Sequence, residues 1–191
     1  NQDEKITALS LDKSGLTEDN RNYLRKFLDV TKSQLFFSNG VILVEGISES
    51  LLLPIFSKIM GEDGEFDLEN VGIELVNING VAFSHFANMF NNEDENKNLK
   101  TRCSLITDDD RAEETDEIDS RAKNAKELER KNLKVFLAER TFEFELFVAG
   151  NKDILIDIFR EMHPVAANRI VEDEDVKIYA ANFLEKVVAN K

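Results

Sequence analysis

The chain has 191 residues, 42% of them hydrophobic, which is enough for one compact domain with a core. It carries 24 basic and 38 acidic residues, a net charge of −14, which opposes tight binding of nucleic acid by the chain alone because phosphate contacts provide most non-specific affinity. No stretch has the apolar length needed to span a bilayer, and the single cysteine excludes an internal disulfide. We therefore expect a cytoplasmic protein without membrane contacts.

The N-terminal segment 1–40 is typical of a lead-in followed by a helix. Apolar residues at three- and four-residue spacing follow Thr17, a good N-cap, and predict a helix over 17–38. The unbroken apolar run 41–45 then predicts a strand that is buried on both faces. Gly46 after this strand allows a tight turn.

A second helix is expected directly after this strand. Ser48 can cap it, and the apolar pattern continues to about Met60. Pro54 lies within this range, so it either kinks the helix or places the helix start near Leu53. The expected inward face of the helix consists of Leu51, Leu52, Ile55, Phe56 and Ile59.

Two more strands and a short helix are predicted in the middle of the chain. The strand 72–79 is rich in aliphatic residues and is ended by Gly80, and the helix 81–90 is rich in phenylalanine. The polar segment 91–100 is expected to form a loop. The strand 102–107 is apolar and leads into three consecutive aspartates.

The last third of the chain is predicted to be mainly helical. The charged segment that follows the aspartates suggests an exposed loop and then a solvated helix over about 116–131. Residues 133–138 form a fourth apolar strand. Amphipathic spacing predicts three further helices, at 142–149, 151–162 and 174–189.

Strand and helix thus alternate four times before a helical tail. This order is typical of an α/β fold with a parallel four-stranded sheet flanked by helices. We expect three parts: an N-terminal lead-in and helix at 1–40, a catalytic core at 41–150 and a helical C-terminal segment at 151–191.

Acidic residues follow two of the predicted strands. Glu45 ends the first strand, and Asp108, Asp109 and Asp110 follow the third. Ligands of parallel sheets bind at the carboxyl ends of the strands, where these side chains would gather. Asp108 and Asp110 would share a face if the strand persists, and Asp109 would point away with a structural role. Gathered carboxylates repel each other unless a cation holds them, and Mg²⁺ prefers such oxygen ligands.

Two further glutamates are candidates for the same site. Glu49 lies in the first turn of the helix after Gly46, and Glu143 lies in the first turn of a helix that Thr141 can cap. A carboxylate is favourable there for the helix dipole alone, so a structural role is the competing interpretation. If the motif is aligned two residues further along the chain, Glu145 replaces Glu143 as the candidate ligand.

The remaining reactive residues favour structural roles. Cys103 lies beside an apolar strand and is expected to be a small buried residue rather than a nucleophile. His85 and His163 have no partners at metal-ligand spacing. Tyr23 and Tyr179 are the only tyrosines, and neither has a setting typical of a topoisomerase nucleophile.

The ordered motifs resemble a known family pattern. A strand ending in Glu45-Gly46 and a later strand ending in Asp108-x-Asp110 are similar to the Toprim domain of topoisomerases, primases and certain nucleases. The run Leu-Phe-Phe-Ser-Asn-Gly-Val-Ile-Leu-Val-Glu-Gly at 35–46, with Ser-Glu-Ser-Leu-Leu-Leu-Pro at 48–54, resembles more specifically the nuclease domain of the OLD (overcoming lysogenization defect) family of ATP-dependent endonucleases. Ile-Asn-Gly at 78–80, Ile-Thr-Asp-Asp-Asp at 106–110 and Thr-Phe-Glu-Phe-Glu-Leu at 141–146 resemble its later motifs. The resemblance covers roughly residues 20–147.

The resemblance implies a Toprim-like, Rossmann-like fold and DNA cleavage with Mg²⁺ or Mn²⁺, two ions being expected. The metal ligands that it implies are Glu45, Glu49, Asp108, Asp110 and Glu143. Glu45, Asp108 and Asp110 would also be catalytic, and Lys177 is the nearest match to a family lysine that offsets charge in the transition state.

The resemblance also implies partners beyond this chain: DNA, an ATPase domain of the same full-length protein and further copies of the chain in a homo-oligomer. Roles in phage defence or DNA processing follow from it as well. No Gly-x-x-x-x-Gly-Lys-Ser/Thr loop occurs in these residues, and the chain begins with Asn1, so we expect a nuclease domain cut from a longer protein.

Two other functions remain as alternatives. The net charge of −14 is also compatible with a catalytically silent metal-binding module for regulation or assembly, which needs an ATPase partner to engage DNA. A receiver-like phosphoryl-transfer domain would accept phosphate on an aspartate such as Asp108. That class requires an acid pair at the first strand, where this chain has a glutamate followed by glycine.

Overall fold

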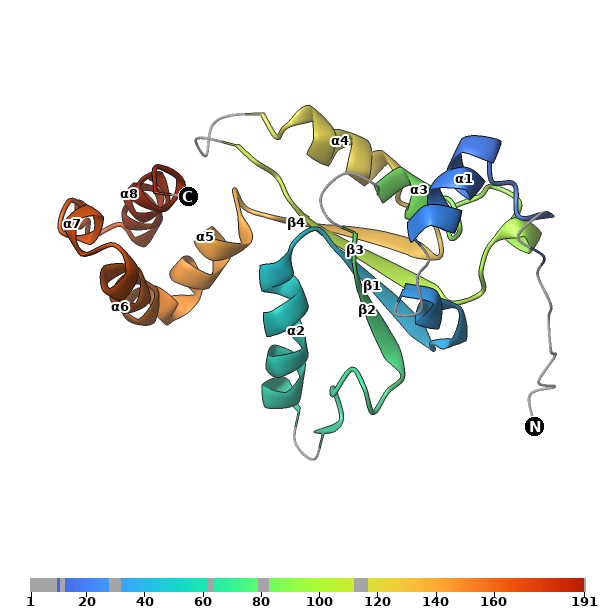
Figure 1. The fold of residues 1–191 in the computed structure, drawn as a ribbon, viewed down its shortest axis with the longest axis horizontal. Coiled ribbons are helices and arrows are strands. Elements are labelled where there is room, and N and C mark those ends of the chain that lie inside the picture. The colour runs from blue at the N-terminus through green and yellow to red at the C-terminus, as the bar shows by residue number, and fades with distance from the viewer. Residues whose placement is uncertain are drawn as a thin grey trace. The chain divides into compact units, whose positions relative to one another are not determined.

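A computed structural model describes residues 10, 13–27, 32–61, 64–78, 83–111 and 117–190 (Figure 1). The chain divides into two compact units. Unit 1 comprises Asn1–Thr107 and Ser120–Phe136, and unit 2 comprises Asp108–Asp119 and Leu137–Lys191. Each unit is described by itself below.

A four-stranded parallel sheet organises unit 1, which confirms the predicted α/β fold. Its strands follow the spatial order β2-β1-β3-β4. In the register of the central strand β1, Val44 lies opposite Asn77 of β2 and Ile106 of β3, so the carboxyl ends of these neighbours meet at one edge. The strands are β1 (Gly40–Val44), β2 (Ile73–Asn77), β3 (Arg102–Asp108) and β4 (Leu133–Ala138).

Helices cover both faces of this sheet, with α2 on one side and α1, α3 and α4 on the other (Figure 1). The helical elements of unit 1 are α1 (Glu18–Phe27), the 3-10 helix η2 (Lys32–Phe37), α2 (Ile47–Met60), α3 (Phe83–Ala87), the 3-10 helix η4 (Glu95–Lys97) and α4 (Ser120–Glu127). Fully buried side chains of the strands and of the helical segments form the core, among them Leu35, Leu43, Phe86, Phe90, Leu105 and Leu133.

The predicted helix 17–38 is wrong in its second part. Its start is confirmed, because the Thr17 hydroxyl oxygen accepts a hydrogen bond from the Asn20 backbone N–H at 3.2 Å. Residues 28–31 lie outside the described part of the chain, and η2 is a 3-10 helix rather than a continuation of the α-helix. The Ser38 hydroxyl donates to the Leu35 carbonyl at 2.9 Å, a local bond that competes with helix continuation.

The helix α2 begins earlier than predicted, and the face that it buries differs from the predicted one. Gly46 rather than Ser48 occupies the N-cap position, and the helix continues through Pro54. Its buried residues are Glu49 and Ser57, whereas three of the five residues expected to face inward are exposed: Leu51, Ile55 and Ile59. Because apolar residues occur on several sides of this helix, its periodicity did not identify the buried side.

Two predicted segments of unit 1 are shorter in the structure. The Phe-rich helix is limited to α3, and Gly80 with the rest of 79–82 lies outside the described residues. The solvated helix is limited to α4, while 112–116 is not described. The loop 91–100 includes the single 3-10 turn η4.

Unit 2 is helical around its own core, as predicted for the C-terminal part. Its elements are α5 (Phe142–Leu146), the π-helical segment η5 (Phe147–Asn151), α6 (Lys152–Met162), α7 (Pro164–Ala167) and α8 (Val176–Val188). Gly150, with a φ of 103°, makes the kink between α5 and α6. The short helix α7 was not predicted, although Pro164 occupies its start, a position that favours proline.

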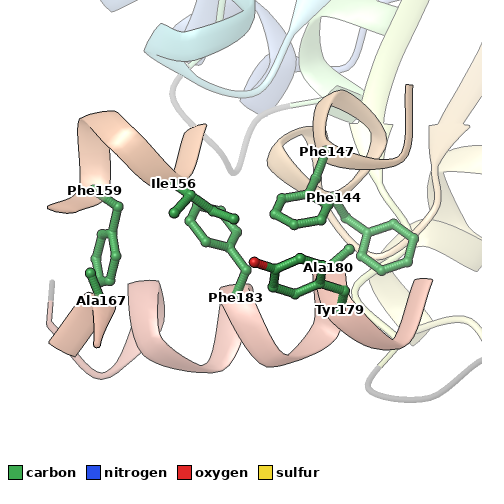
Figure 2. Close-up of a cluster of buried hydrophobic side chains, with 8 residues drawn as sticks. All are labelled: Phe144, Phe147, Ile156, Phe159, Ala167, Tyr179, Ala180 and Phe183. Atoms are coloured by element: carbon green, nitrogen blue, oxygen red, sulfur yellow. The ribbon is translucent and has the colours of Figure 1, made fainter. Parts of the chain in front are cut away.

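Aromatic residues fill the core of unit 2 (Figure 2). The Phe147 ring contacts Tyr179 and Phe183, with ring centroids 5.2 and 5.1 Å apart. Phe159 packs edge-on against Phe183 at 5.7 Å. Across the described residues of both units, we find no helix with the length and apolar character that crossing a membrane requires.

Candidate functional site

The carboxylate of Glu45 is held in place by two side chains of unit 1. The Thr107 hydroxyl, from β3, donates to Oε2 at 2.6 Å. The Arg121 guanidinium, from α4, donates to Oε1 at 2.6 Å in an ion pair. Thr107 is buried and the Glu45 side chain is 17% exposed, whereas the Arg121 side chain is 39% exposed, so the contact with Thr107 is the better shielded from solvent. Glu45 therefore has a fixed orientation at the carboxyl end of β1.

Gly46 brings a second carboxylate close to the backbone at this strand end. A Cβ atom at position 46 would lie 2.8 Å from Oε2 of Glu49, nearer than a Cβ atom normally lies to another atom. The φ of Gly46 is −126°, which any residue adopts, so the glycine leaves space for the Glu49 carboxylate in this position and is not required by the backbone conformation. Glu49 is 5% exposed on the buried side of α2.

The donor set of unit 1 fits a hard divalent cation by its chemistry. Glu45 and Glu49 offer carboxylate oxygens, the ligands that Mg²⁺ and Mn²⁺ prefer. Each oxygen of Glu45 accepts one hydrogen bond and retains a further lone pair. Among the described residues, however, no three side chains of His, Cys, Asp or Glu gather closely enough to hold a metal ion.

A pocket of about 390 Å³ lies beside this part of unit 1. Its polar lining includes Arg121, Ser84, Ser120 and Asn124. Arg121 thus contacts Glu45 and also borders an open space. That position allows the guanidinium to meet a bound anion next to the carboxylate.

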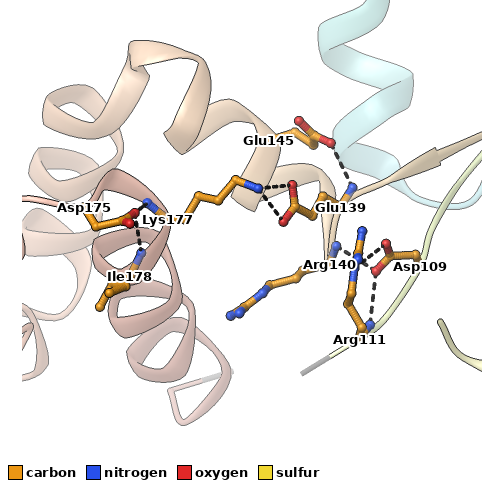
Figure 3. A network of polar contacts seen from close by, with 8 residues as sticks. All are labelled: Asp109, Arg111, Glu139, Arg140, Glu145, Asp175, Lys177 and Ile178. Atoms are coloured by element: carbon orange, nitrogen blue, oxygen red, sulfur yellow. Dashed lines mark hydrogen bonds and ion pairs between the residues drawn. The ribbon is translucent and has the colours of Figure 1, made fainter. Parts of the chain in front are cut away.

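In unit 2, Asp109 organises the loop after β3 (Figure 3). Its buried carboxylate accepts backbone N–H groups of Arg111 at 3.1 Å and Arg140 at 2.9 Å, and forms an ion pair with the Arg111 side chain at 2.8 Å. Its own N–H donates to the Ala138 carbonyl at 3.0 Å. These contacts confirm the predicted structural role of Asp109.

The loop around Asp109 contains two strained residues that contact each other. Asp110 and Arg140 have φ values of 52° and 60°, in the left-handed region. The Asp110 N–H donates to the Arg140 carbonyl at 3.1 Å. Strain of this kind persists where surrounding bonds fix it and often marks functional loops. The strand ends at Asp108, so the alternation expected to place Asp108 and Asp110 on one face does not apply.

The helix α5 carries the next two candidates. Thr141 caps it, because its hydroxyl oxygen accepts from the Phe144 N–H at 3.2 Å. Glu143 is half-buried in its first turn. Glu145 instead accepts the Glu139 N–H at 2.8 Å, which gives it a role in holding the turn after β4.

Lys177, at the start of α8, contacts the same turn (Figure 3). Its ammonium group donates to both carboxylate oxygens of Glu139 at 3.0 Å. Glu139 directly precedes Arg140, whose backbone binds Asp109 and Asp110. Within unit 2, the predicted lysine is therefore connected to the loop that carries the acidic residues.

Four residues of this region were not predicted: Thr107, Arg121, Glu139 and Arg140. Thr107 is a polar residue directly after the apolar pair Leu105 and Ile106, and this could have indicated its role. Arg121 lies in a segment where most residues are charged, so its sequence context did not distinguish it. The predicted structural role of His85 is confirmed, because its ring stacks on Tyr23 and its Nδ1 lies 2.7 Å from the Asn20 side-chain oxygen.

A comparison with protein families gives one match. Residues 36–110 match the family described as "Overcoming lysogenization defect protein-like, TOPRIM domain". Neither the comparison with curated proteins nor that with solved structures found a match. The matched residues include β1, β2 and β3, Glu45, Glu49 and the aspartates at the end of β3, and they supply three of the four strands of the parallel sheet. Over residues 36–110, the match therefore supports a Toprim domain of the OLD-like type.

Proposed function

We propose that this chain is a metal-dependent DNA endonuclease domain. The observation that carries the proposal is the fixed carboxylate of Glu45, bound by Thr107 and Arg121 at the end of β1, inside the matched OLD-like Toprim region. The Arg121 ion pair and the Thr107 hydrogen bond offset the cost of partly burying this carboxylate, and they hold it at the strand end, where ligands of parallel sheets bind.

Mg²⁺ or Mn²⁺ is the proposed cofactor, with two ions engaged. When bound, such ions activate water and stabilise the charge that develops at phosphorus. The side chains proposed to hold them are Glu45, Glu49, Asp108, Asp110 and Glu143. Thr107 and Arg121 orient Glu45 for this task, and Asp109 fixes the backbone of Arg111, directly after Asp110, and that of Arg140.

Two cationic side chains are proposed to bind the substrate phosphate. Arg121 borders the pocket in unit 1, where its guanidinium has the geometry that phosphate oxygens favour. Lys177 is held by Glu139 beside the loop of unit 2 and would offset negative charge in the transition state. An ATPase domain of the same full-length protein is the proposed source of additional DNA affinity, which the net charge of −14 does not favour in this chain.

Plasmid cleavage tests this function directly. The purified chain is incubated with supercoiled DNA and Mn²⁺, and we expect nicked and linear products. Asp108→Asn should reduce the rate at least a hundredfold, because it removes a charged metal ligand while keeping the shape of the side chain. Far-UV circular dichroism establishes that this variant is folded.

Asp157→Asn is the matched control. Asp157 is an exposed aspartate of α6 that pairs with Arg160 on the same helix, so its change should leave cleavage unaltered. Equal cutting by wild type and Asp108→Asn would show that a contaminating nuclease is responsible. Metal binding by calorimetry without any cleavage would instead favour the silent regulatory module.

A further inference from the structure

Arg140 lies in the turn between β4 and α5, and the described part of the chain does not neutralise its charge. Its guanidinium lies over the Phe144 ring, 5.0 Å from the ring centroid. Its Nε atom is buried, and no residue that the structure describes accepts a hydrogen bond from it. In Figure 3 the side chain extends away from Asp109, and no dashed line joins its guanidinium to a residue drawn there. Buried donors without an acceptor are rare in folded proteins, so this guanidinium needs an explanation.

Two other cationic side chains of unit 2, near the same turn, have acidic partners. Arg111 forms an ion pair with Asp109 at 2.8 Å, and Lys177 donates to both carboxylate oxygens of Glu139 at 3.0 Å. The chain has 38 acidic and 24 basic residues, so carboxylates are in excess over cations. In such a chain, an arginine that lacks an acidic partner among the described residues is available for an anion from outside.

The backbone at position 140 is held in a conformation that arginine rarely adopts. Its φ of 60° lies in the left-handed region, where a Cβ atom is unfavourable and glycine is preferred. The N–H of Arg140 donates to Asp109 at 2.9 Å, and its carbonyl accepts the Asp110 N–H at 3.1 Å. Glycine would make these two backbone contacts equally well. The turn therefore does not explain the arginine, and the contacts of its guanidinium must.

Phosphate is the anion that suits this guanidinium and its surroundings. The planar fork of N–H donors matches two oxygens of a phosphate group. Stacking on Phe144, which is 1% exposed, restricts the plane of the guanidinium and so orients its donors. The same part of unit 2 carries Asp108, Asp110 and Glu143, which are proposed metal ligands. Divalent ions and arginine bind phosphate oxygens together in phosphoryl-transfer sites, so a phosphate here would use both.

We propose that Arg140 binds a backbone phosphate of a DNA strand beside the loop that carries Asp108 and Asp110. The inference rests on the proposed function and adds a substrate-binding residue to it. Lys177 would have to share its charge between Glu139 and a phosphate, whereas Arg140 gives up no ion pair with a described residue. Arg140 is therefore the principal phosphate contact of unit 2. Its role is to position the strand, because a guanidinium does not release a proton in proteins.

The salt dependence of DNA binding tests this role without cleavage. Fluorescence anisotropy follows a labelled DNA duplex in Ca²⁺, in place of Mn²⁺, over a series of KCl concentrations. Each phosphate contact contributes about 0.9 to the slope of log K against log salt concentration. Arg140→Gln should therefore reduce the slope by about one and weaken binding at low salt about tenfold. Arg169→Gln is the matched control, because it removes the same charge from an exposed position of unit 2 and should leave the slope unchanged.

Two further variants at position 140 separate binding from folding. Arg140→Lys keeps the charge, so it should restore the slope of the wild type, while the affinity stays lower because an ammonium group lacks the fork of donors. Arg140→Gly suits the left-handed backbone, so its urea midpoint should equal or exceed that of the wild type. Its DNA binding should nevertheless weaken as in Arg140→Gln.

The outcomes distinguish this inference from the proposed function. An unchanged slope in Arg140→Gln, or no DNA binding by the wild type, would overturn the inference. A lower urea midpoint in Arg140→Gly with unchanged DNA binding would also overturn it, because the arginine would then have a purely structural role. DNA binding that depends on Arg140, without cleavage in Mn²⁺, would support the inference and contradict the proposed endonuclease.

Discussion

At the residue scale, hydrogen bonds fix the Glu45 side chain, and packing against Gly46 determines where the Glu49 side chain lies. Glu45 is fixed by Thr107 and Arg121, while Glu49 occupies the space that a side chain at position 46 would need. Glu45 and Gly46 thus act together, because the absence of a side chain at Gly46 leaves room for the Glu49 carboxylate next to the strand end that carries Glu45. Changing the glycine should displace Glu49 without changing any charge.

We predict that Gly46→Ala reduces Mn²⁺-dependent cleavage at least tenfold. The added methyl group meets Oε2 of Glu49 at 2.8 Å and forces that carboxylate away. Because the backbone at position 46 is extended, the cost in the free energy of unfolding should remain below about 2 kcal/mol. Cleavage rates and urea unfolding measure the two effects. Gly40→Ala, whose methyl would meet the flexible Ile73 side chain at 3.2 Å at the start of β1, should retain activity.

A second residue prediction concerns pH. Burial raises the pKa of Glu74 above its ordinary value, so the folded state binds this proton more tightly than the unfolded state. Its contribution to stability is therefore greatest below the unfolded pKa and falls as pH rises through the folded pKa. Glu74→Gln should raise the free energy of unfolding at pH 7, and this gain should vanish below about pH 4. An equal gain from Glu65→Gln, at an exposed position, would contradict the assignment to burial.

At the scale of elements, the sequence predicted strands better than helix faces. The strand 133–138 has the predicted bounds, and β1 and β3 agree within one residue at each end, because buried parallel strands are continuous apolar runs. The helix α2 has the opposite property: its apolar residues occur on several sides, so its pattern does not predict that Glu49 is buried and Leu51 exposed. Glu45 was predictable from its position after a strand, whereas the contact from Arg121 depends on folding over 76 residues.

Pro54 is an unusual feature of α2, and it gives a prediction at this scale. It lies inside the helix, where it has no N–H to donate to the Ser50 carbonyl. Pro54→Ala restores this bond and should raise the free energy of unfolding by up to about 3 kcal/mol. Pro164→Ala is the internal control, because Pro164 starts α7, where a missing N–H has no cost. Urea unfolding compares the two variants, and an equal effect from both would contradict the explanation.

At the scale of the whole molecule, two separate cores make up the chain. Unit 1 buries aliphatic and phenylalanine side chains around its sheet, and unit 2 buries an aromatic cluster among its helices. The chain has no tryptophan and two tyrosines, one in each unit. Tyr23 of unit 1 stacks on His85 at 4.1 Å, and Tyr179 of unit 2 packs against Phe147. Each tyrosine therefore reports on its own core.

We predict that Phe147→Ala destabilises unit 2 selectively. Phe147 is fully buried, and removing such a ring costs about 3–5 kcal/mol. In a Tyr23→Phe background, fluorescence of Tyr179 follows unit 2, and in a Tyr179→Phe background, Tyr23 follows unit 1. The urea midpoint reported by Tyr179 should fall strongly, while that reported by Tyr23 should change little. Equal shifts of both midpoints would contradict this prediction. They would mean that the two cores unfold as one cooperative structure, because a substitution that destabilises one core would then lower the urea midpoint of the other by the same amount.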